Sequence, residues 1–446
     1  MTTTTAPATT SRSPFGVRDF RLLWTGEAIS SLGDQFALIA LPWLALVLTG
    51  SALALGGVLA LMAVPRALLM IVGGVSVDRF SPRRVMLGSN AVRLVAVTAL
   101  GLVVLAGAAQ LWMLYAFALV FGVADAFFFP AQTSIVPELV EGDQLQRANG
   151  IVQGTAQATV LVGPAIAGVV IAALGSGSAG ATDGGIGIAL LFDAATFLAS
   201  LVTLWLIRPR AHNAQEHGSI LESIREGVRF VWSSPGLRAV IVVSLAGNLF
   251  IVGPFEVGMP FIAYSRLPEG AAGFGIVMAA FGGGSLLGLI IASILPAPRG
   301  AWLGPIVIGT LAVAGLGVAA IAFVHTTLLA ALVIGISGTA LGVGNLLGIT
   351  WIQGRIPPEL MGRVMSLMIT GSVGLIPLSM FVAGAAVQLS VDGTMIVAGC
   401  GMALLALGSL LSPSVRNLGL EQRFQQAPAA APAGSATSAT EDAAPA

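Results

Sequence analysis

Charged side chains are scarce in this sequence. Asp, Glu, Lys and Arg together make up 9% of 446 residues, and all 20 basic residues are arginines. A soluble domain carries roughly 25% charged residues, so these charges are too few to build a surface that faces water. Hydrophobic residues make up 56% of the chain. The composition excludes a soluble globular protein and indicates one whose solvent is mostly lipid.

Cysteine and histidine are also rare. A single cysteine, Cys400, excludes an intramolecular disulfide. Of the three histidines, His212 and His217 lie in the expected central linker and His325 in an outer loop, so no catalytic or metal-binding constellation is present. No GxxxxGK[ST] loop occurs, which argues against ATP hydrolysis by this chain. We therefore expect neither an enzyme nor a bound cofactor, and the zero net charge suggests no nucleic-acid partner.

Twelve apolar segments are long enough to cross a bilayer, which takes roughly 20 residues each. They are expected at 22–48, 52–76, 85–107, 111–133, 148–173, 186–207, 238–264, 271–295, 302–324, 327–350, 363–388 and 393–412. The fold class is therefore an all-α membrane protein. We expect a flexible N-terminal segment (1–21), a six-helix bundle (22–207), a cytoplasmic linker with an amphipathic helix (208–237), a second six-helix bundle (238–412) and a disordered tail (413–446).

The arginines predict the orientation, because loops rich in basic residues remain in the cytoplasm. The arginines of the expected termini and loops all lie on one side of the predicted topology except Arg266, and Arg66 and Arg93 lie inside spans. Both termini and the central linker are therefore expected in the cytoplasm, as an even number of spans requires.

Two loops and two spans indicate an internal repeat. Pro137 and Pro357 follow the fourth and tenth spans in similar loops, and Pro164 and Pro377 lie inside the fifth and eleventh spans. A duplication of a six-span unit would produce this spacing. Prolines that coincide by chance are the alternative.

The loop after the second span carries a motif. It reads Gly74-Val-Ser-Val-Asp78-Arg79-Phe-Ser81-Pro-Arg83-Arg84. This resembles the G-x-x-x-D-R-x-G-R-R loop of the major facilitator superfamily, with Ser81 in place of the second glycine. The resemblance implies two pseudo-symmetric six-helix bundles and a loop that engages the second bundle when the cytoplasmic side closes. A simpler role, compatible with the first, is that the arginines keep this loop on the cytoplasmic side of the membrane.

Other stretches are similar to the branch of that superfamily that includes the enterobactin exporter and the macrolide efflux proteins. They are Ser31–Gln35, Phe129–Val140, Leu145–Asn149 and Phe192–Ala194. The resemblance extends over nearly all of residues 15–415. It implies a bacterial inner-membrane carrier of small molecules, which we expect to be a monomer.

A further motif lies in the fifth span. Gly163, Pro164 and Gly168 are similar to the G-P-x-x-G-G signature of the superfamily's antiporters, with Ala167 in place of a glycine. Close helix packing through small residues is an equal alternative. The fourth span lacks the arginine that many drug–proton antiporters carry there, which argues against their usual proton relay.

Charged groups inside the spans are candidate functional residues, since each costs several kcal/mol to bury. Asp34, Asp125 and Glu256 are expected to line a central cavity and carry protons, in that order of preference, with Arg66 paired to Asp34 or Asp125 and Asn345 contributing from the second half. A static ion pair between the first, second and fourth spans is the alternative. Arg93 is expected to reach the cytoplasm or pair with Asp78, and Asp193 to hydrogen-bond between helices.

These residues predict a secondary transporter. The expected function is proton-coupled efflux of a small amphipathic or hydrophobic compound by alternating access. A proton-coupled symporter that imports a nutrient or lipid is the alternative. An intramembrane enzyme or a sensor would need a catalytic cluster or a signalling domain, and the sequence offers neither.

Overall fold

The computed structural model describes residues 13–175, 182–208, 228–233, 235–296, 302–356 and 358–416. In these residues the chain is entirely helical, and twelve helices are long and apolar enough to cross a membrane. Most of the expected amphipathic helix and the tail beyond residue 416 lie outside the described part. The all-helical fold class predicted from hydropathy is confirmed.

The first six spans are single long helices. They are α1 (Arg18–Thr49), α2 (Ala52–Phe80), α3 (Pro82–Leu105), α4 (Leu111–Leu139), α5 (Gly142–Gly175) and α6 (Thr182–Leu206), with a short turn η1 (Pro14–Gly16) before them. Local signals set the ends. The left-handed residue Gly50, with φ of 61°, ends α1, and the Ser51 hydroxyl accepts a hydrogen bond from the Ala54 amide at the start of α2.

The second six spans include one broken helix. The seventh span consists of α8 (Pro235–Gly247), η2 (Asn248–Val252), η3 (Pro254–Gly258) and α9 (Met259–Arg266), of which η2 and η3 are π-helical. The other spans are α10 (Gly270–Ile294), α11 (Leu303–Ile321), α12 (Thr327–Gln353), α13 (Pro358–Leu389) and α14 (Val391–Ser409), followed by the turn α15 (Pro413–Arg416).

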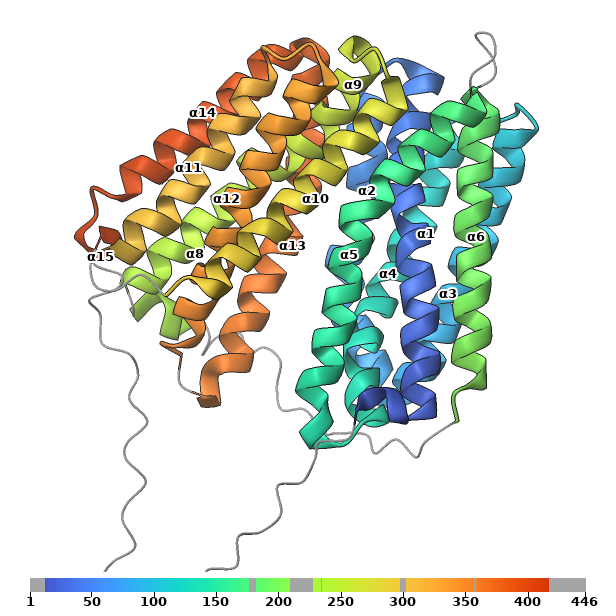
Figure 1. Ribbon diagram of the computed structural model, residues 1–446, viewed down its shortest axis with the longest axis horizontal. Coiled ribbons are helices and arrows are strands. Elements are labelled where there is room, and N and C mark those ends of the chain that lie inside the picture. The colour runs from blue at the N-terminus through green and yellow to red at the C-terminus, as the bar shows by residue number, and fades with distance from the viewer. Residues whose placement is uncertain are drawn as a thin grey trace, which may run out of the picture.

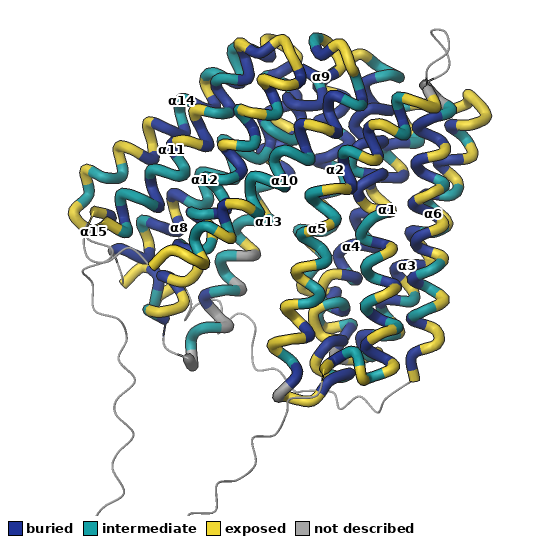
Figure 2. The backbone as a smooth tube through the Cα atoms, viewed as in Figure 1, coloured by how far each residue is buried: buried dark blue, intermediate teal, exposed yellow. Residues whose placement is uncertain are grey.

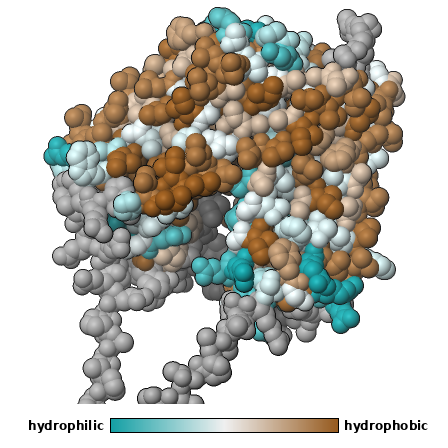
Figure 3. Space-filling model, viewed as in Figure 1, coloured by the Kyte–Doolittle hydropathy of each residue, from teal (hydrophilic) through white to brown (hydrophobic). Residues whose placement is uncertain are grey.

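The helices form two bundles, which we call the N-terminal half (α1–α6) and the C-terminal half (α8–α15) (Figure 1). Their outward faces are apolar yet exposed, as Figures 2 and 3 show and as Leu68 (70% exposed) and Leu328 (82%) illustrate. Such surface is typical of helices that face lipid tails. We call the end with both described termini the arginine-rich end and the opposite one the arginine-poor end.

The two halves touch near the arginine-poor end. Gly56 of α2 lies against Gly384 of α13, and Gly168 of α5 lies against Gly275 of α10, so closely that a Cβ at Gly56 would come within 2.7 Å of the Gly384 Cα. Toward the arginine-rich end the halves diverge, and the surface is hollowed between them (Figures 1 and 3). The structure is therefore a conformation open at one end.

Candidate functional site

A buried ion pair connects α3 and α4 in the N-terminal half. The Arg93 guanidinium donates a hydrogen bond to Asp125 Oδ1, and these residues are only 3% and 8% exposed. A second cation, Arg66 of α2, has a guanidinium nitrogen 3.9 Å from Asp125 Oδ2. Of the two partners that the sequence allowed for Arg66, the structure places Asp125 beside it.

Arg93 corrects the expectation from the sequence, which placed its side chain at the cytoplasm or beside Asp78. Its guanidinium carbon lies 4.0 Å from the centre of the Phe128 ring, 5.4 Å from that of Phe121 and 5.7 Å from that of Phe197. Aromatic faces attract a cation most strongly where water is absent. The rings and Asp125 together compensate for burying the charge, so Arg93 can remain inside the bundle.

Asp34 is a carboxyl group halfway along α1. It follows the first residue of that helix by sixteen positions, a rise of about 24 Å. The side chain is exposed and makes no hydrogen bond or ion pair with another described residue. Its electrostatic neighbours are Arg93 and Asp125, which places it on the side of α1 that faces the bundle. Asp34 is therefore an exposed carboxyl group without a described hydrogen-bond or ion-pair partner.

Glu27 belongs to the same face of α1 and was missed from the sequence. Its Oε2 accepts a hydrogen bond of 2.5 Å from Gln132 of α4, and its buried Oε1 has no partner in the described structure. The seven-residue separation from Asp34, which equals two helical turns, was the signal that could have revealed it.

Asp193 of α6 is fully buried close to this group. One carboxylate oxygen accepts a hydrogen bond of 3.4 Å from Thr196, and the other has no partner in the described structure. Thr196 lies on α6 like Asp193 itself, so the expected hydrogen bond between helices is not what the described structure shows. Glu27, Asp34, Asp125 and Asp193 therefore share two cations, Arg66 and Arg93, within electrostatic range of one another. The described residues contain no group of His, Cys, Asp or Glu arranged to hold a metal.

Glu256 lies in the C-terminal half on the π-helical segment η3. It is half-buried, and Arg66 of the N-terminal half is its electrostatic neighbour. Arg66 therefore interacts with a carboxylate of each half, with Asp125 at 3.9 Å and electrostatically with Glu256.

A serine from α13 holds the break in the seventh span open. The Ser379 hydroxyl accepts a hydrogen bond of 2.9 Å from the Gly253 amide and donates one of 2.8 Å to the Leu249 carbonyl. In an α-helix that amide would bind that carbonyl directly. The hydroxyl is inserted into this bond, which explains why the helix departs from α geometry between η2 and η3.

The motif after α2 is partly described. Arg83 donates hydrogen bonds to the carbonyls of Leu204 and Trp205, at 2.9 and 2.7 Å, and so caps the C-terminus of α6. Arg79 and Arg84 are exposed, and Gly74 has open space around it. Ser81 adopts φ of 73°, so it keeps the positive angle that glycine would favour. The side chain of Asp78 lies outside the described part, so its expected contact with α13 stays a prediction.

The motif in α5 lies at the interface between the halves. A Cβ at Gly275 of α10 would come within 2.3 Å of the Pro164 carbonyl, and Gly168 faces the same residue. Gly163 receives the Gln35 side chain of α1. This geometry favours close helix packing as the role of Gly163, Pro164 and Gly168.

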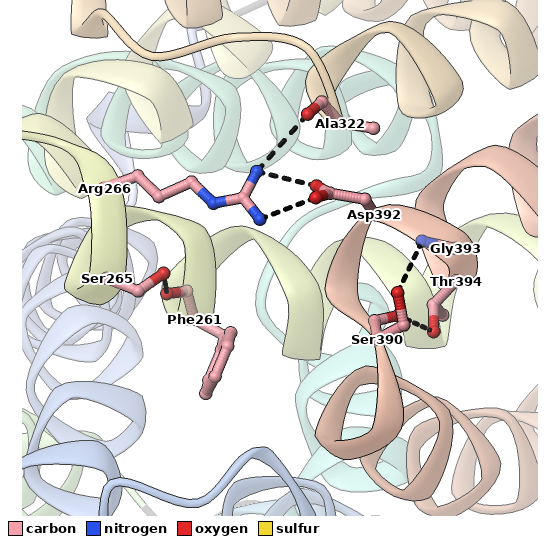
Figure 4. A network of polar contacts seen from close by, with 8 residues as sticks. All are labelled: Phe261, Ser265, Arg266, Ala322, Ser390, Asp392, Gly393 and Thr394. Atoms are coloured by element: carbon pink, nitrogen blue, oxygen red, sulfur yellow. Dashed lines mark hydrogen bonds and ion pairs between the residues drawn. The ribbon is translucent and has the colours of Figure 1, made fainter.

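The arginine-poor end of the C-terminal half is held by an ion pair (Figure 4). Arg266 of α9 forms two parallel hydrogen bonds with Asp392 of α14, at 2.6 and 2.9 Å, and a third with the Ala322 carbonyl after α11. A bidentate arginine–carboxylate pair fixes orientation as well as distance. Three helices of one half are therefore linked at this end.

Comparison with known proteins identifies the family of this twelve-span chain. A model of the family described as transmembrane secretion effector matches residues 9–430. The chain belongs to the transmembrane secretion effector family. This is a family of major facilitator transporters, so the resemblance seen in the sequence is confirmed and the protein is a multi-pass membrane transporter.

Relatives of the chain with curated functions include efflux pumps. The chain is 27% identical to the multidrug efflux pump Tap of Mycolicibacterium fortuitum over 93% of its own length and 99% of that protein. It is 23% identical to macrolide efflux protein A of Streptococcus pyogenes, over 60% of this chain and 64% of that one. The transporter is therefore related to bacterial efflux pumps.

Solved structures share the fold. The nucleoside transporter NupG matches with a TM-score of 0.66 at 15% identity, over 87% of this chain and 98% of that one. A bacterial homologue of ferroportin in an inward-facing state matches with a TM-score of 0.68 at 17% identity, over 88% and 98%. At these identities the likeness shows the fold alone.

Proposed function

We propose that this transporter exports a small amphipathic or hydrophobic compound in exchange for protons, by alternating access. The observation that carries the proposal is Asp34, a carboxyl group in the middle of a membrane span, exposed and without an ion-pair partner in the described structure. An unpaired carboxylate in a low-dielectric region is costly, and a proton is the smallest charge that neutralises it. Relatives that are efflux pumps support export as the direction.

The open end of the structure faces the cytoplasm in this proposal. Arginine-rich loops remain inside, and the hollow between the halves opens at the arginine-rich end. The glycine contacts of α2 with α13 and of α5 with α10 would then close the outer side. A compound dissolved in the cytoplasm or the inner leaflet can enter this conformation.

The charge group supplies the coupling. Asp34 loses its proton to the cytoplasm in the inward-open state, which adds a negative charge beside Arg93 and Asp125. Arg66, whose contact with Asp125 is loose at 3.9 Å, is shared with Glu256 of the other half and responds to that change. A proton that arrives from outside neutralises Asp34 again and reverses this change. The proton shifts the balance between the inward-open and outward-open states because its affinity for Asp34 differs between them.

Transport in inside-out membrane vesicles tests the proposal. Respiration acidifies the lumen, so an exporter accumulates chloramphenicol, a neutral amphipathic compound, inside the vesicle while the lumen becomes more alkaline. The Asp34→Asn variant is expected to lower pH-driven accumulation by at least about tenfold. Glu141→Gln, an exposed carboxyl outside the spans, is the matched control and is expected to transport normally.

Two results would contradict the proposal. A symporter that imports would expel the compound from the acidified lumen instead of accumulating it. Undiminished pH-driven transport by Asp34→Asn would remove Asp34 from the coupling mechanism.

A further inference from the structure

A cavity of about 590 Å³ lies in the C-terminal half. Every described residue that lines it belongs to that half, from the seventh span and from α10, α11, α12 and α13. This volume lies within the range of roughly 300–1,000 Å³ of sites for small molecules. Its position separates it from the carboxyl groups of the N-terminal half.

The lining of the cavity is apolar and uncharged. Apolar side chains such as Phe281, Ile308 and Met365 predominate, and none of the described lining residues carries a charge. The polar groups are two asparagines and three serines, namely Asn248, Asn345, Ser244, Ser285 and Ser372. An ion placed here would lose its hydration without gaining a counter-ion. The lining therefore favours a neutral ligand.

The two asparagines have the character of ligand contacts. Neither side chain forms a hydrogen bond with another described residue, although each amide offers two donor hydrogens and an acceptor oxygen. Asn248 begins η2, so the break that Ser379 maintains in the seventh span supplies part of the cavity wall. A π-helical segment inside an α-helix is frequently found at functional sites. Two unsatisfied amides that face an apolar cavity can orient a carbonyl, amide or hydroxyl group of a bound molecule.

We infer that the C-terminal half alone holds the exported compound, as a neutral molecule whose hydrogen-bonding groups pair with Asn248 and Asn345. The inference rests on the proposed function, because it names the substrate class of that transporter. The two halves then divide the work: the N-terminal half carries the charge group and the C-terminal half carries the cargo. Met365 and Met368 in the lining adapt to ligands of different shape, since methionine side chains are flexible.

Equilibrium binding to the purified transporter in detergent tests this without any gradient. The neutral probes are chloramphenicol, which has an amide and hydroxyl groups, and N-phenyl-1-naphthylamine, and the cationic probe is ethidium. The blocking variant is Gly348→Leu, because Gly348 lines the cavity and a Cβ there meets open space, so the new side chain fills the cavity without a clash. Gly408→Leu on α14 is the matched control, since Gly408 also faces open space but does not line the cavity.

Neutral probes are expected to bind the wild type, and Gly348→Leu is expected to weaken that binding at least about tenfold while Gly408→Leu leaves it unchanged. The double variant Asn248→Leu, Asn345→Leu keeps the apolar volume and is expected to weaken chloramphenicol more than N-phenyl-1-naphthylamine. The inference would be overturned if the wild type bound ethidium but neither neutral probe, or bound no probe at all. It would also be overturned if Gly348→Leu bound the neutral probes as tightly as the wild type.

The binding results separate this inference from the proposed function. Asp34→Asn is expected to retain neutral-probe binding although it loses pH-driven transport. If the wild type binds the neutral probes but shows no pH-driven transport, the proton-driven mechanism alone is refuted. Coupled transport with binding that Gly348→Leu does not change would refute the cavity assignment alone.

Discussion

Ser379→Ala removes the hydroxyl that is inserted into the seventh span. The side chain is 1% exposed and serves two backbone groups, the Gly253 amide and the Leu249 carbonyl. Each hydrogen bond contributes about 0.5–1.5 kcal/mol net, and buried groups that lose a partner cost more. Hydrogen bonds between membrane helices average about 0.6 kcal/mol. The substitution should therefore lower the free energy of unfolding by about 1–3 kcal/mol.

The helix cannot easily recover this loss by closing the broken bond. A Cβ at Gly253 would lie 2.2 Å from the Ser379 carbonyl oxygen, so the backbones of the seventh span and α13 are already in contact. Closing the amide–carbonyl bond would require the π-helical segments to rewind against that contact. The loss of the two Ser379 hydrogen bonds should consequently lower the free energy of unfolding.

Equilibrium unfolding in mixed micelles, with increasing SDS, measures this effect. Ser265→Ala is the matched control, because the exposed Ser265 hydroxyl bonds only to the Phe261 carbonyl of its own helix. Ser379→Thr retains the hydroxyl and should recover part of the stability. If Ser379→Ala unfolds at the same SDS fraction as Ser265→Ala, the hydroxyl is not what supports the break.

Three other predictions concern a buried ion pair, the packing of the two halves and a strained backbone angle. Arg93→Leu leaves Asp125 with only the distant Arg66 and should destabilise the protein by about 3–5 kcal/mol, measured by the same SDS titration; an unchanged midpoint would contradict the ion pair. Gly384→Leu forces α2 and α13 apart, so spin labels at Leu53 and Leu389 in a Cys400→Ala background should move apart, whereas Gly408→Leu should not change their distance. Ser81→Gly relieves a positive φ and should stabilise by about 1 kcal/mol in the SDS titration, and a loss of stability would show that the serine is unstrained.

Hydropathy was sufficient to find the spans because lipid contact acts on every residue of a helix. The predicted segment 302–324 became α11, Leu303–Ile321, and the others agree to within a few residues at most ends. The same segments placed Asp34 and Asp125 inside spans. Depth does not give direction around the helix axis, however, which is why Arg93 was placed at the surface although it points into the bundle.

Features that depend on a partner helix could not be predicted. The break in the seventh span requires a serine 126 residues away, and nothing local to Asn248–Gly258 except Gly253 and Pro254 indicates it. Asn345 was recognised as a polar group in an apolar span, but Asn248 and the cavity depend on how five helices pack. Glu27 was missed although its spacing from Asp34 was visible.

The meeting of α2 with α13, and of α5 with α10, is made by glycine backbones. The described polar links there are also neutral, because the Gln388 side-chain oxygen of α13 accepts hydrogen bonds of 2.9 Å from the Ser51 hydroxyl just before α2 and of 3.4 Å from the Leu53 amide. Dissolved ions screen charges but leave shape complementarity untouched. A change from fresh water to brine outside the cell should therefore leave these contacts between the halves unchanged. The electrostatic attraction between Arg266 and Asp392 at the same end should weaken as the salt concentration rises.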